Sequence, residues 1–308
     1  MSFTIALSNV LLTLLYIIPG FIICKMKKVR PEHLSTMSAV LIYVCSPCMV
    51  INSFLQIEFS WSGFTQMVLF FAVTLVLQIA FMLILYAVCH RKYGESKYRI
   101  LTIGAVFGNV GFFGLPVVKA ILPANPEVMC YSSIFVLSMN LLVFTIGVFC
   151  LTNDKKYMTL KSAILNPTTF SILVALPLYF FGVRQYMPDL LTNAFSLLSS
   201  MTTPLCMIIL GIRLATVSLK KLFTRPIIYL ICALKLIVFP LFCFAAVYFL
   251  PLDFAFKASI LILTAVPCAS ILLNMAEIHH SETELAANCV LVSTLLCFLT
   301  IPVLVLLL

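Results

Sequence analysis

The sequence has 308 residues, of which 63% are apolar and only 9% are charged, and its mean hydropathy is +1.18. Soluble domains are typically about 45–50% apolar and about 25% charged. So few charges argue against a cytosolic enzyme, a nucleic-acid-binding protein and a disordered scaffold. The excess of 19 Lys and Arg over 10 Asp and Glu instead suits a membrane protein with basic cytoplasmic loops.

Ten apolar runs follow one another along the chain, and each is long enough to cross a bilayer. A spanning helix needs about 20 mostly apolar residues. The first run carries its basic residues behind it, which predicts a spanning helix and not a removed signal peptide. The third run is long enough to be strongly tilted. The predicted spans are 5–24, 34–56, 62–90, 100–121, 128–151, 163–182, 190–214, 226–250, 257–276 and 285–307.

The basic residues predict how these spans are oriented. Fifteen of the 19 lie in the connections after spans 1, 3, 5 and 7. The connections after spans 2, 4, 6 and 8 hold only Lys119, Arg184 and Lys257, and Lys235 lies inside span 8. Cytoplasmic loops collect Lys and Arg, so we expect an integral protein of the cell membrane with both termini outside.

The ten spans divide into two halves of five, 1–155 and 156–308. An odd number of spans in each half gives the halves opposite orientations. Prolines recur at separations of 28 and 69 residues in the first half and of 27 and 63 in the second. This match predicts an inverted repeat within one integral membrane domain. The prolines that match are Pro19, Pro47 and Pro116 in the first half and Pro177, Pro204 and Pro267 in the second.

Spans 4 and 9 contain helix-breaking residues at equivalent positions. Span 4 has three glycines and a proline within ten residues, and span 9 has a proline in the segment 264–270. Paired interrupted helices in inverted halves mark the central site of many transporters, and the starts of their second segments suit an anion. Tightly packed, kinked helices are the alternative. The residues expected at the crossing are Gly108, Gly111, Gly114, Pro116 and Pro267.

Several polar residues are expected at or near the depth of these breaks. Asn109, Asn140 and Lys235 fall near the middle of their spans, by a rise of about 1.5 Å per residue. Lys235 has no carboxylate within a span as partner. It would neutralise a substrate anion or take part in coupling, unless it is a snorkelling lysine or one held by backbone carbonyls. Asn274 and Glu277 are candidates for the inner mouth, with a solvated loop as the alternative.

Three motifs give the chain a resemblance to the auxin efflux carrier family. The first two are Gly108-Asn109-x-Gly111-Phe112-x-Gly114-Leu115-Pro116 in span 4 and Leu210-Gly211-Ile212-Arg213-Leu214-Ala215 in span 7. The third is Val266-Pro267-Cys268-Ala269, followed by Leu291-Val292-Ser293-Thr294 and Thr300-Ile301-Pro302. The chain is similar to the family over nearly its whole length.

The resemblance implies an all-α membrane fold of ten helices in two inverted repeats, like that of bile acid sodium symporters, with helices 4 and 9 crossing at mid-membrane. It also implies elevator-like transport of organic anions, typically carboxylates. The family's span-4 asparagine maps onto Asn109, and its crossing prolines map onto Pro116 and Pro267. The short loop 151–161 is similar to bacterial members described as malonate or malate carriers.

Rival functions have weaker signals. A membrane thiol-oxidoreductase would use Cys45 and Cys48, but with twelve cysteines this spacing is expected by chance about half the time. His279 and His280 lie beside acidic residues and could bind a metal weakly, although a solvated loop is the simpler interpretation. No phosphate-binding Gly-Lys-Ser/Thr motif is present. A receptor or channel on the same fold is a further alternative.

The sequence therefore predicts a secondary carrier and not an enzyme, with no cofactor and no metal. A small organic anion would bind Asn109, Asn140, Ser270 and Lys235, and the chain would move it by elevator-type alternating access around the helix 4/helix 9 crossing. Transport would be driven by the membrane potential or coupled to H⁺ or Na⁺, with a sodium symporter as the main alternative. We expect the lipid bilayer as a partner and no nucleic acid, and a homodimer is left open.

Overall fold

The structure is a computed structural model that describes residues 2–152, 154, 156, 158, 160–217, 225–279 and 281–308. Within these residues the chain is helical almost throughout, without a β-strand. The first half contains α1 (Ser2–Leu15), α2 (Ile17–Lys25), α3 (Leu34–Val40), α4 (Ser46–Leu55), α5 (Trp61–Cys89), α6 (Ser96–Gly104), α7 (Leu115–Ile121), α8 (Glu127–Leu142) and α9 (Val148–Thr152).

The rest of the described chain is helical as well. It contains α10 (Leu160–Ile164), α11 (Pro167–Phe180), α12 (Asp189–Ser200), α13 (Thr202–Thr216), α15 (Pro226–Ala233), α16 (Phe239–Tyr248), α17 (Phe254–Thr264), α18 (Ser270–Ile278) and α19 (Thr283–Leu304). Several neighbouring helices are joined by one wider, π-helical turn. These turns are Leu41–Cys45, Val110–Gly114, Val143–Gly147 and Leu234–Val238. The 3₁₀ turns are Pro31–His33, His90–Lys92, Val183–Tyr186 and Val305–Leu307.

The described residues contain seven continuous helices that are long and apolar enough to cross a membrane. They overlap predicted spans 1, 2, 3, 5, 7, 8 and 10, and shorter apolar helices overlap spans 4, 6 and 9. The chain is therefore an integral membrane protein by length and composition of its helices. The long helices are Phe3–Lys25, Leu34–Leu55, Trp61–Lys92, Glu127–Thr152, Asp189–Thr216, Pro226–Tyr248 and Thr283–Leu307, and the short ones are Val110–Ile121, Pro167–Phe180 and Phe254–Thr264.

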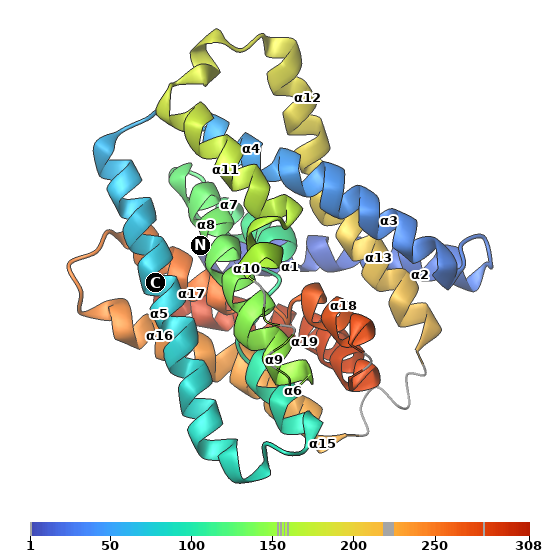
Figure 1. The fold of residues 1–308 in the computed structure, drawn as a ribbon. Coiled ribbons are helices and arrows are strands. Elements are labelled where there is room, and N and C mark those ends of the chain that lie inside the picture. Colours follow the sequence, from blue (N-terminus) through green and yellow to red (C-terminus); the bar gives the residue numbers. More distant parts are fainter. Residues whose placement is uncertain are drawn as a thin grey trace.

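The helices pack as two bundles. The first bundle contains α2 against α13 and α4 against α11 and α12, and the second contains α5 against α8, α16 against α17, and α18 against α19 (Figure 1). Helix α1 packs on α19 and so joins the two bundles. The contact between α2 and α13 is close because two glycines face the other helix. A Cβ at Gly20 would lie 2.1 Å from the Ile208 carbonyl oxygen, and one at Gly211 would lie 2.1 Å from that of Ile17.

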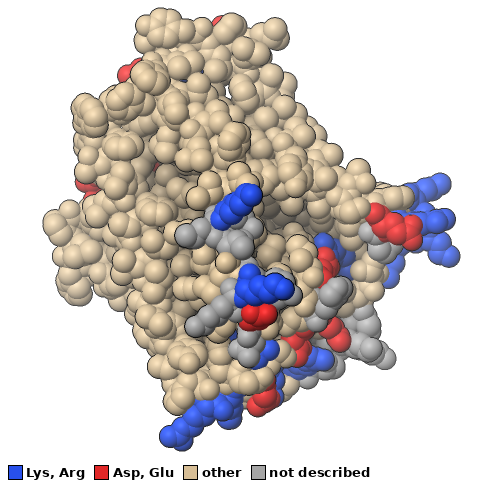
Figure 2. Space-filling model, viewed as in Figure 1, with Lys and Arg blue, Asp and Glu red and all other residues tan. Residues whose placement is uncertain are grey.

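Charges are distributed unevenly over the surface. On the face shown in Figure 2, Lys and Arg lie in the middle and along the lower and right-hand margins, and the upper part is almost free of them. The turns from α2 to α3 and from α5 to α6 lie at the charged margins, whereas the turn from α11 to α12 lies at the top (Figure 1). This segregation is the pattern that the positive-inside rule predicts. The ten-span topology and the position of the termini stay predictions.

Candidate functional site at the crossing of two broken helices

Two interrupted helices meet where the sequence places the breaks. Helix α6 ends at Gly104 and the chain becomes helical again at Val110, while α17 ends at Thr264 and α18 begins at Ser270. The unwound segments run antiparallel and pair as a bridge between Gly108 and Cys268. The Asn109 N–H donates to the Pro267 carbonyl at 2.8 Å, and the Ala269 N–H donates to the Phe107 carbonyl at 3.0 Å. The two breaks thus satisfy each other's backbone groups, which lipid could not do.

The residue types at the crossing follow from this close contact. A Cβ at Gly108 would lie 2.7 Å from Val266 Cγ2 and 2.8 Å from Lys235 Nζ, so only glycine fits without movement. Gly114 faces Leu263 and Val266 of the other broken helix, and Gly111 faces Met49. Pro116 stands in the first turn of α7, directly after the π-helical turn Val110–Gly114.

A central cavity of about 120 Å³ lies beside the crossing. Asn109, Asn140 and Ser270 all line it, and they come from three different elements. Both Asn side chains are buried. The Ser270 hydroxyl is also buried and has no hydrogen-bond partner among the described residues. The cavity is also lined by Ser46, Thr168 and Cys206 from helices of the first bundle, and by Asn166 directly before α11.

The cavity also receives the beginnings of two helical segments. Residues 108–112, at the start of the segment Val110–Ile121, line it, as do residues 269–271 at the start of α18. The first N–H groups of a helix have no partner within the helix and form the positive end of its dipole. The side-chain amide of Asn109 makes one long contact, of 3.9 Å, with the sulfur of Cys206, and a thiol is a weak acceptor. The same Cys206 thiol lies next to Ser270. Hydrogen-bond donors therefore line the cavity, and among the described residues the Ser270 hydroxyl has no partner.

Lys235 reaches the crossing but not the cavity wall. Its side chain is fully buried, and Nζ donates to the Thr264 carbonyl at 2.8 Å, at the C-terminal end of α17. Nζ also lies 4.9 Å from the centre of the Phe239 ring. This is the carbonyl-held lysine that the sequence left open as one interpretation. Its charge stabilises a helix end where the chain unwinds, because a helix C-terminus is the negative end of the dipole.

The two candidates for the inner mouth lie beside a second, larger cavity, here called the vestibule. Asn274 lines both the central cavity and the vestibule, whereas Glu277 lines the vestibule alone. Ser38, Leu210 and Arg213 also line both, so the two cavities are adjoining. Glu32, Glu277 and Glu284 give the vestibule three carboxylates.

Sequence reasoning missed Arg213. It was counted among the basic residues of a loop, but it lies inside α13 and lines the central cavity. Its NH1 is paired with Glu277 Oε1 at 2.8 Å. The signal that could have identified it was its position within the predicted span 190–214, where an ionisable side chain is a functional candidate by default.

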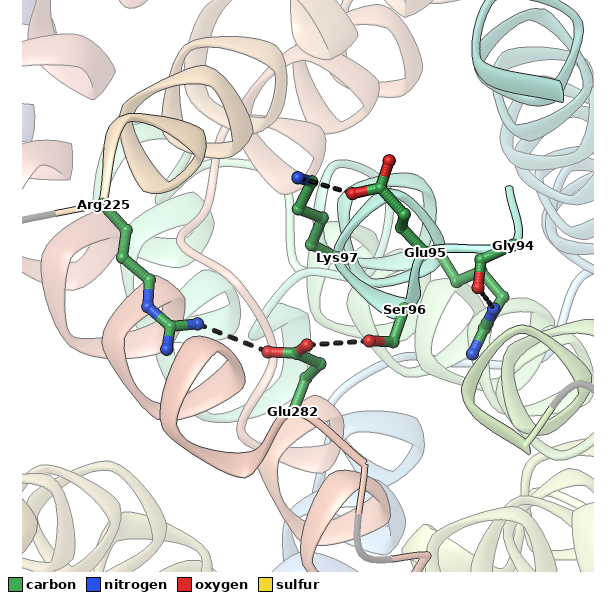
Figure 3. A network of polar contacts seen from close by, with 7 residues as sticks. Gly94, Glu95, Ser96, Lys97, Arg225 and Glu282 are labelled. Atoms are coloured by element: carbon green, nitrogen blue, oxygen red, sulfur yellow. Dashed lines mark hydrogen bonds and ion pairs between the residues drawn. The ribbon is translucent and has the colours of Figure 1, made fainter. Parts of the chain in front are cut away.

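A polar network joins the ends of three helices on the charged side of the molecule (Figure 3). Glu282, just before α19, accepts from Ser96 Oγ at 2.7 Å and pairs with Arg225 at 3.4 Å, so it connects the beginnings of α6, α15 and α19. Glu95 and Lys97 form a neighbouring ion pair at 2.6 Å. Helices α6, α15 and α19 lie within residues 96–304, the stretch that also contains both unwound segments.

The residues of the rival functions lie elsewhere. Cys45 and Cys48 are free cysteines in the second predicted span, and neither lines the central cavity. No group of three or more His, Cys, Asp or Glu that could hold a metal occurs in the described part of the chain, and His280 lies outside the described residues.

Comparison with known proteins places this geometry in a family. The model of the family described as "Membrane transport protein" matches residues 5–305. The chain is 25% identical over 310 residues to an uncharacterized transporter of Methanothermobacter thermautotrophicus, covering 98% of both chains. It is also 25% identical over 309 residues to an uncharacterized transporter of Methanocaldococcus jannaschii, covering 96% of this chain and 97% of the other. The chain therefore belongs to the membrane transport protein family, the auxin efflux carrier family whose motifs its sequence carries.

Proposed function

We propose that the protein is a secondary carrier for a small organic anion, with the anion's carboxylate bound in the central cavity. Membership of a membrane transporter family supports transport as the activity. The observation that carries a bound polar ligand is the buried Ser270 hydroxyl, which has no hydrogen-bond partner among the described residues and lines the same cavity as Asn109 and Asn140. Buried polar groups in folded proteins nearly always have hydrogen-bond partners, so a ligand is expected to supply this one.

The donors of the cavity suit a carboxylate better than a cation. A carboxylate only accepts hydrogen bonds, and here it would accept them from the Ser270 hydroxyl, the Asn109 amide and the first N–H groups of two helical segments. Hydrogen bonds to an ionised acceptor are roughly twice as strong as those between neutral groups. They would offset the cost of moving the anion out of water into a buried site.

The position of the cavity between two bundles supports elevator-type alternating access. Asn140 and Ser270 belong to helices of the second bundle and Asn109 to the break that pairs with the one before α18, whereas Ser46, Thr168 and Cys206 on the same cavity belong to the first bundle. Polar contacts between the bundles near the cavity include the bond from Thr203 Oγ1 to the Phe112 carbonyl at 2.7 Å. Sliding of the crossing past the first bundle would carry the bound anion with it.

Two contacts support the inverted repeat of residues 1–155 and 156–308. The equivalent breaks of spans 4 and 9 pair with each other at Gly108 and Cys268. The equivalent segments before Pro47 and Pro204 also meet, because Thr202 Oγ1 donates to the Cys45 carbonyl at 3.3 Å. A two-fold axis between the halves would place equivalent segments in contact in this way.

Lys235 favours transport driven by the membrane potential over sodium symport. In ion-coupled carriers with broken helices, the carbonyls at the ends of the half-helices coordinate the ion. Here the Thr264 carbonyl already binds the ammonium group of Lys235. We therefore place Lys235 as a positioning residue behind the crossing and keep Asn109, Asn140 and Ser270 as the substrate ligands.

Counterflow in liposomes tests the proposed function. Vesicles containing the purified protein are loaded with unlabelled malonate or malate and diluted into the labelled anion. A carrier gives a transient accumulation of label above equilibrium, whereas a channel or a receptor does not. Absence of counterflow for small mono- and dicarboxylates, with correctly folded protein in the vesicles, would contradict the proposal.

A further inference from the structure

Arg213 is the one charged side chain that the described residues contribute to the wall of the central cavity. It lies in the last turn of α13, and 18% of its side chain is exposed. A guanidinium that is largely removed from water needs an anionic partner, because the desolvation free energy of an unpaired charge is strongly unfavourable.

In the structure that partner is Glu277. The two side chains approach to 2.8 Å, and Glu277 is 44% exposed. Glu277 lies on the vestibule wall and does not line the central cavity. The ion pair joins α13 of the first bundle to α18, whose beginning forms part of the crossing.

The other charged residues of the vestibule wall indicate what the Arg213–Glu277 pair does. Besides Glu277, the described lining contains Glu32 and Glu284, and Arg213 is its one basic residue. Along the described wall, an anion that enters from this side passes these carboxylates, of which Glu284 is paired with Arg225 at 3.8 Å, and meets Arg213 at the junction with the central cavity. That cation is already bound to a carboxylate.

We infer that Arg213 is a substrate-recognition residue whose guanidinium exchanges the Glu277 carboxylate for a carboxylate of the transported anion. The planar fork of arginine suits this exchange, because a guanidinium can bind a carboxylate with two parallel hydrogen bonds, whereas the contact with Glu277 is a single one from NH1 to Oε1. Glu277 then acts as a tethered competitor that holds Arg213 while the site is empty. The inference rests on the proposed function for the chemistry of the ligand.

The exchange also links substrate binding to the contact between the bundles. When Arg213 turns to the bound anion, the ion pair between α13 and α18 is released. The empty carrier keeps the ion pair between the two bundles, and the substrate-bound carrier lacks it. Movement of the crossing relative to the first bundle is therefore favoured only with substrate bound.

Three variants separate recognition from a simple latch. Malonate, malate and acetate serve as probes, with counterflow kinetics and the thermal unfolding midpoint of the purified protein as readouts. Glu277→Gln should lower KM about two- to fivefold, the size of a partly exposed ion pair. Arg213→Gln should raise KM at least tenfold and remove the midpoint shift caused by the probes.

The charge-swapped variant R213E/E277R is decisive. It keeps an ion pair between α13 and α18 but moves the cation from the central cavity to the vestibule wall. We expect it to recover the unfolding midpoint of the wild type while KM stays raised. Glu95→Gln is the matched control, because it breaks the exposed pair with Lys97 (Figure 3) and should leave KM unchanged.

Each remaining outcome has a definite meaning. Recovery of the wild-type KM by R213E/E277R would overturn the inference and make the pair a structural latch. The same holds if none of the three probes shifts the midpoint of the wild type, or if they shift Arg213→Gln equally. A shift that depends on Arg213, without any counterflow, would reject the proposed carrier and leave the recognition role standing.

Discussion

The backbone N–H of Asn109 donates to the carbonyl of Pro267 at 2.8 Å, across 158 residues of sequence. This bond joins the two breaks and fixes the place where the Asn109 side chain enters the cavity. Pro267 contributes in two ways. It has no N–H that needs a partner, and its carbonyl lies outside a helix and can accept from Asn109. The site thus depends on backbone pairing of two segments that neither half-chain could form alone.

Gly108→Ala tests this close contact. The added methyl would lie 2.7 Å from Val266 and 2.8 Å from Lys235 Nζ, and overpacking of this kind costs about 1–3 kcal/mol. We expect a lower unfolding midpoint and weaker transport. Gly94→Ala is the control, because a Cβ at Gly94 meets nothing within 4 Å. Equal midpoints for the two variants would show that the crossing is looser than the structure has it.

Ser270→Ala separates binding from stability. The Ser270 hydroxyl has no hydrogen-bond partner in the part of the chain that the structure describes, so its removal should leave the unfolding midpoint unchanged or slightly raised while KM for the anion increases. Ser293 offers the contrast, because its hydroxyl accepts from the Cys268 N–H at 3.0 Å. Ser293→Ala should lower stability by about 1–3 kcal/mol by leaving that buried N–H unpaired. A Ser270→Ala variant with unchanged KM would remove Ser270 from the site.

Lys235→Met tests the buried cation. We expect the wild type to transport at the same rate in sodium and in N-methylglucamine media, and the variant to lose at least tenfold in rate. Lys257→Met is the matched control, because Lys257 also donates to a carbonyl at a helix end, that of Tyr248 at 2.8 Å, but in an exposed position. Its rate should stay near that of the wild type. A wild type that requires sodium would instead support the symporter alternative.

Labelling of introduced cysteines tests the topology in a cysteine-free background. Residues at 27 and 94 belong to predicted cytoplasmic connections, and residues at 59 and 187 to predicted external ones. A membrane-impermeant maleimide added to intact cells should label only the second pair. Labelling of the first pair in intact cells would reverse the predicted orientation.

The sequence predicts the breaks well because their causes are local. Glycine and proline disfavour a helix, and Gly108 and Pro267 lie in the two unwound segments, whereas Gly111, Gly114 and Pro116 lie in the helical segment that follows the first break. Their equivalent places in the two halves further indicate that the breaks meet, and the structure pairs Gly108 with Cys268.

The roles of Lys235 and Arg213 depend on contacts between helices far apart in the sequence, so they could not be predicted from the sequence alone. Depth along a span is readable from residue counts, and it places Lys235 near the midplane. The direction of its side chain depends on how the helix is rotated against α17, and that rotation turns Nζ toward the Thr264 carbonyl. Arg213 was missed for a related reason, since only the fold of α13 beside α18 brings it to the cavity and to Glu277.

Counterflow by the wild type and by Asn109→Ala, reconstituted in parallel at equal protein content, tests the central claim most directly. Asn109 lines the cavity with its side chain, while its backbone bond to Pro267 is independent of side-chain identity, so the variant should fold. We predict accumulation of labelled malonate or malate by the wild type and at least tenfold slower counterflow by the variant. Equal counterflow by the two proteins would contradict a substrate site at the crossing.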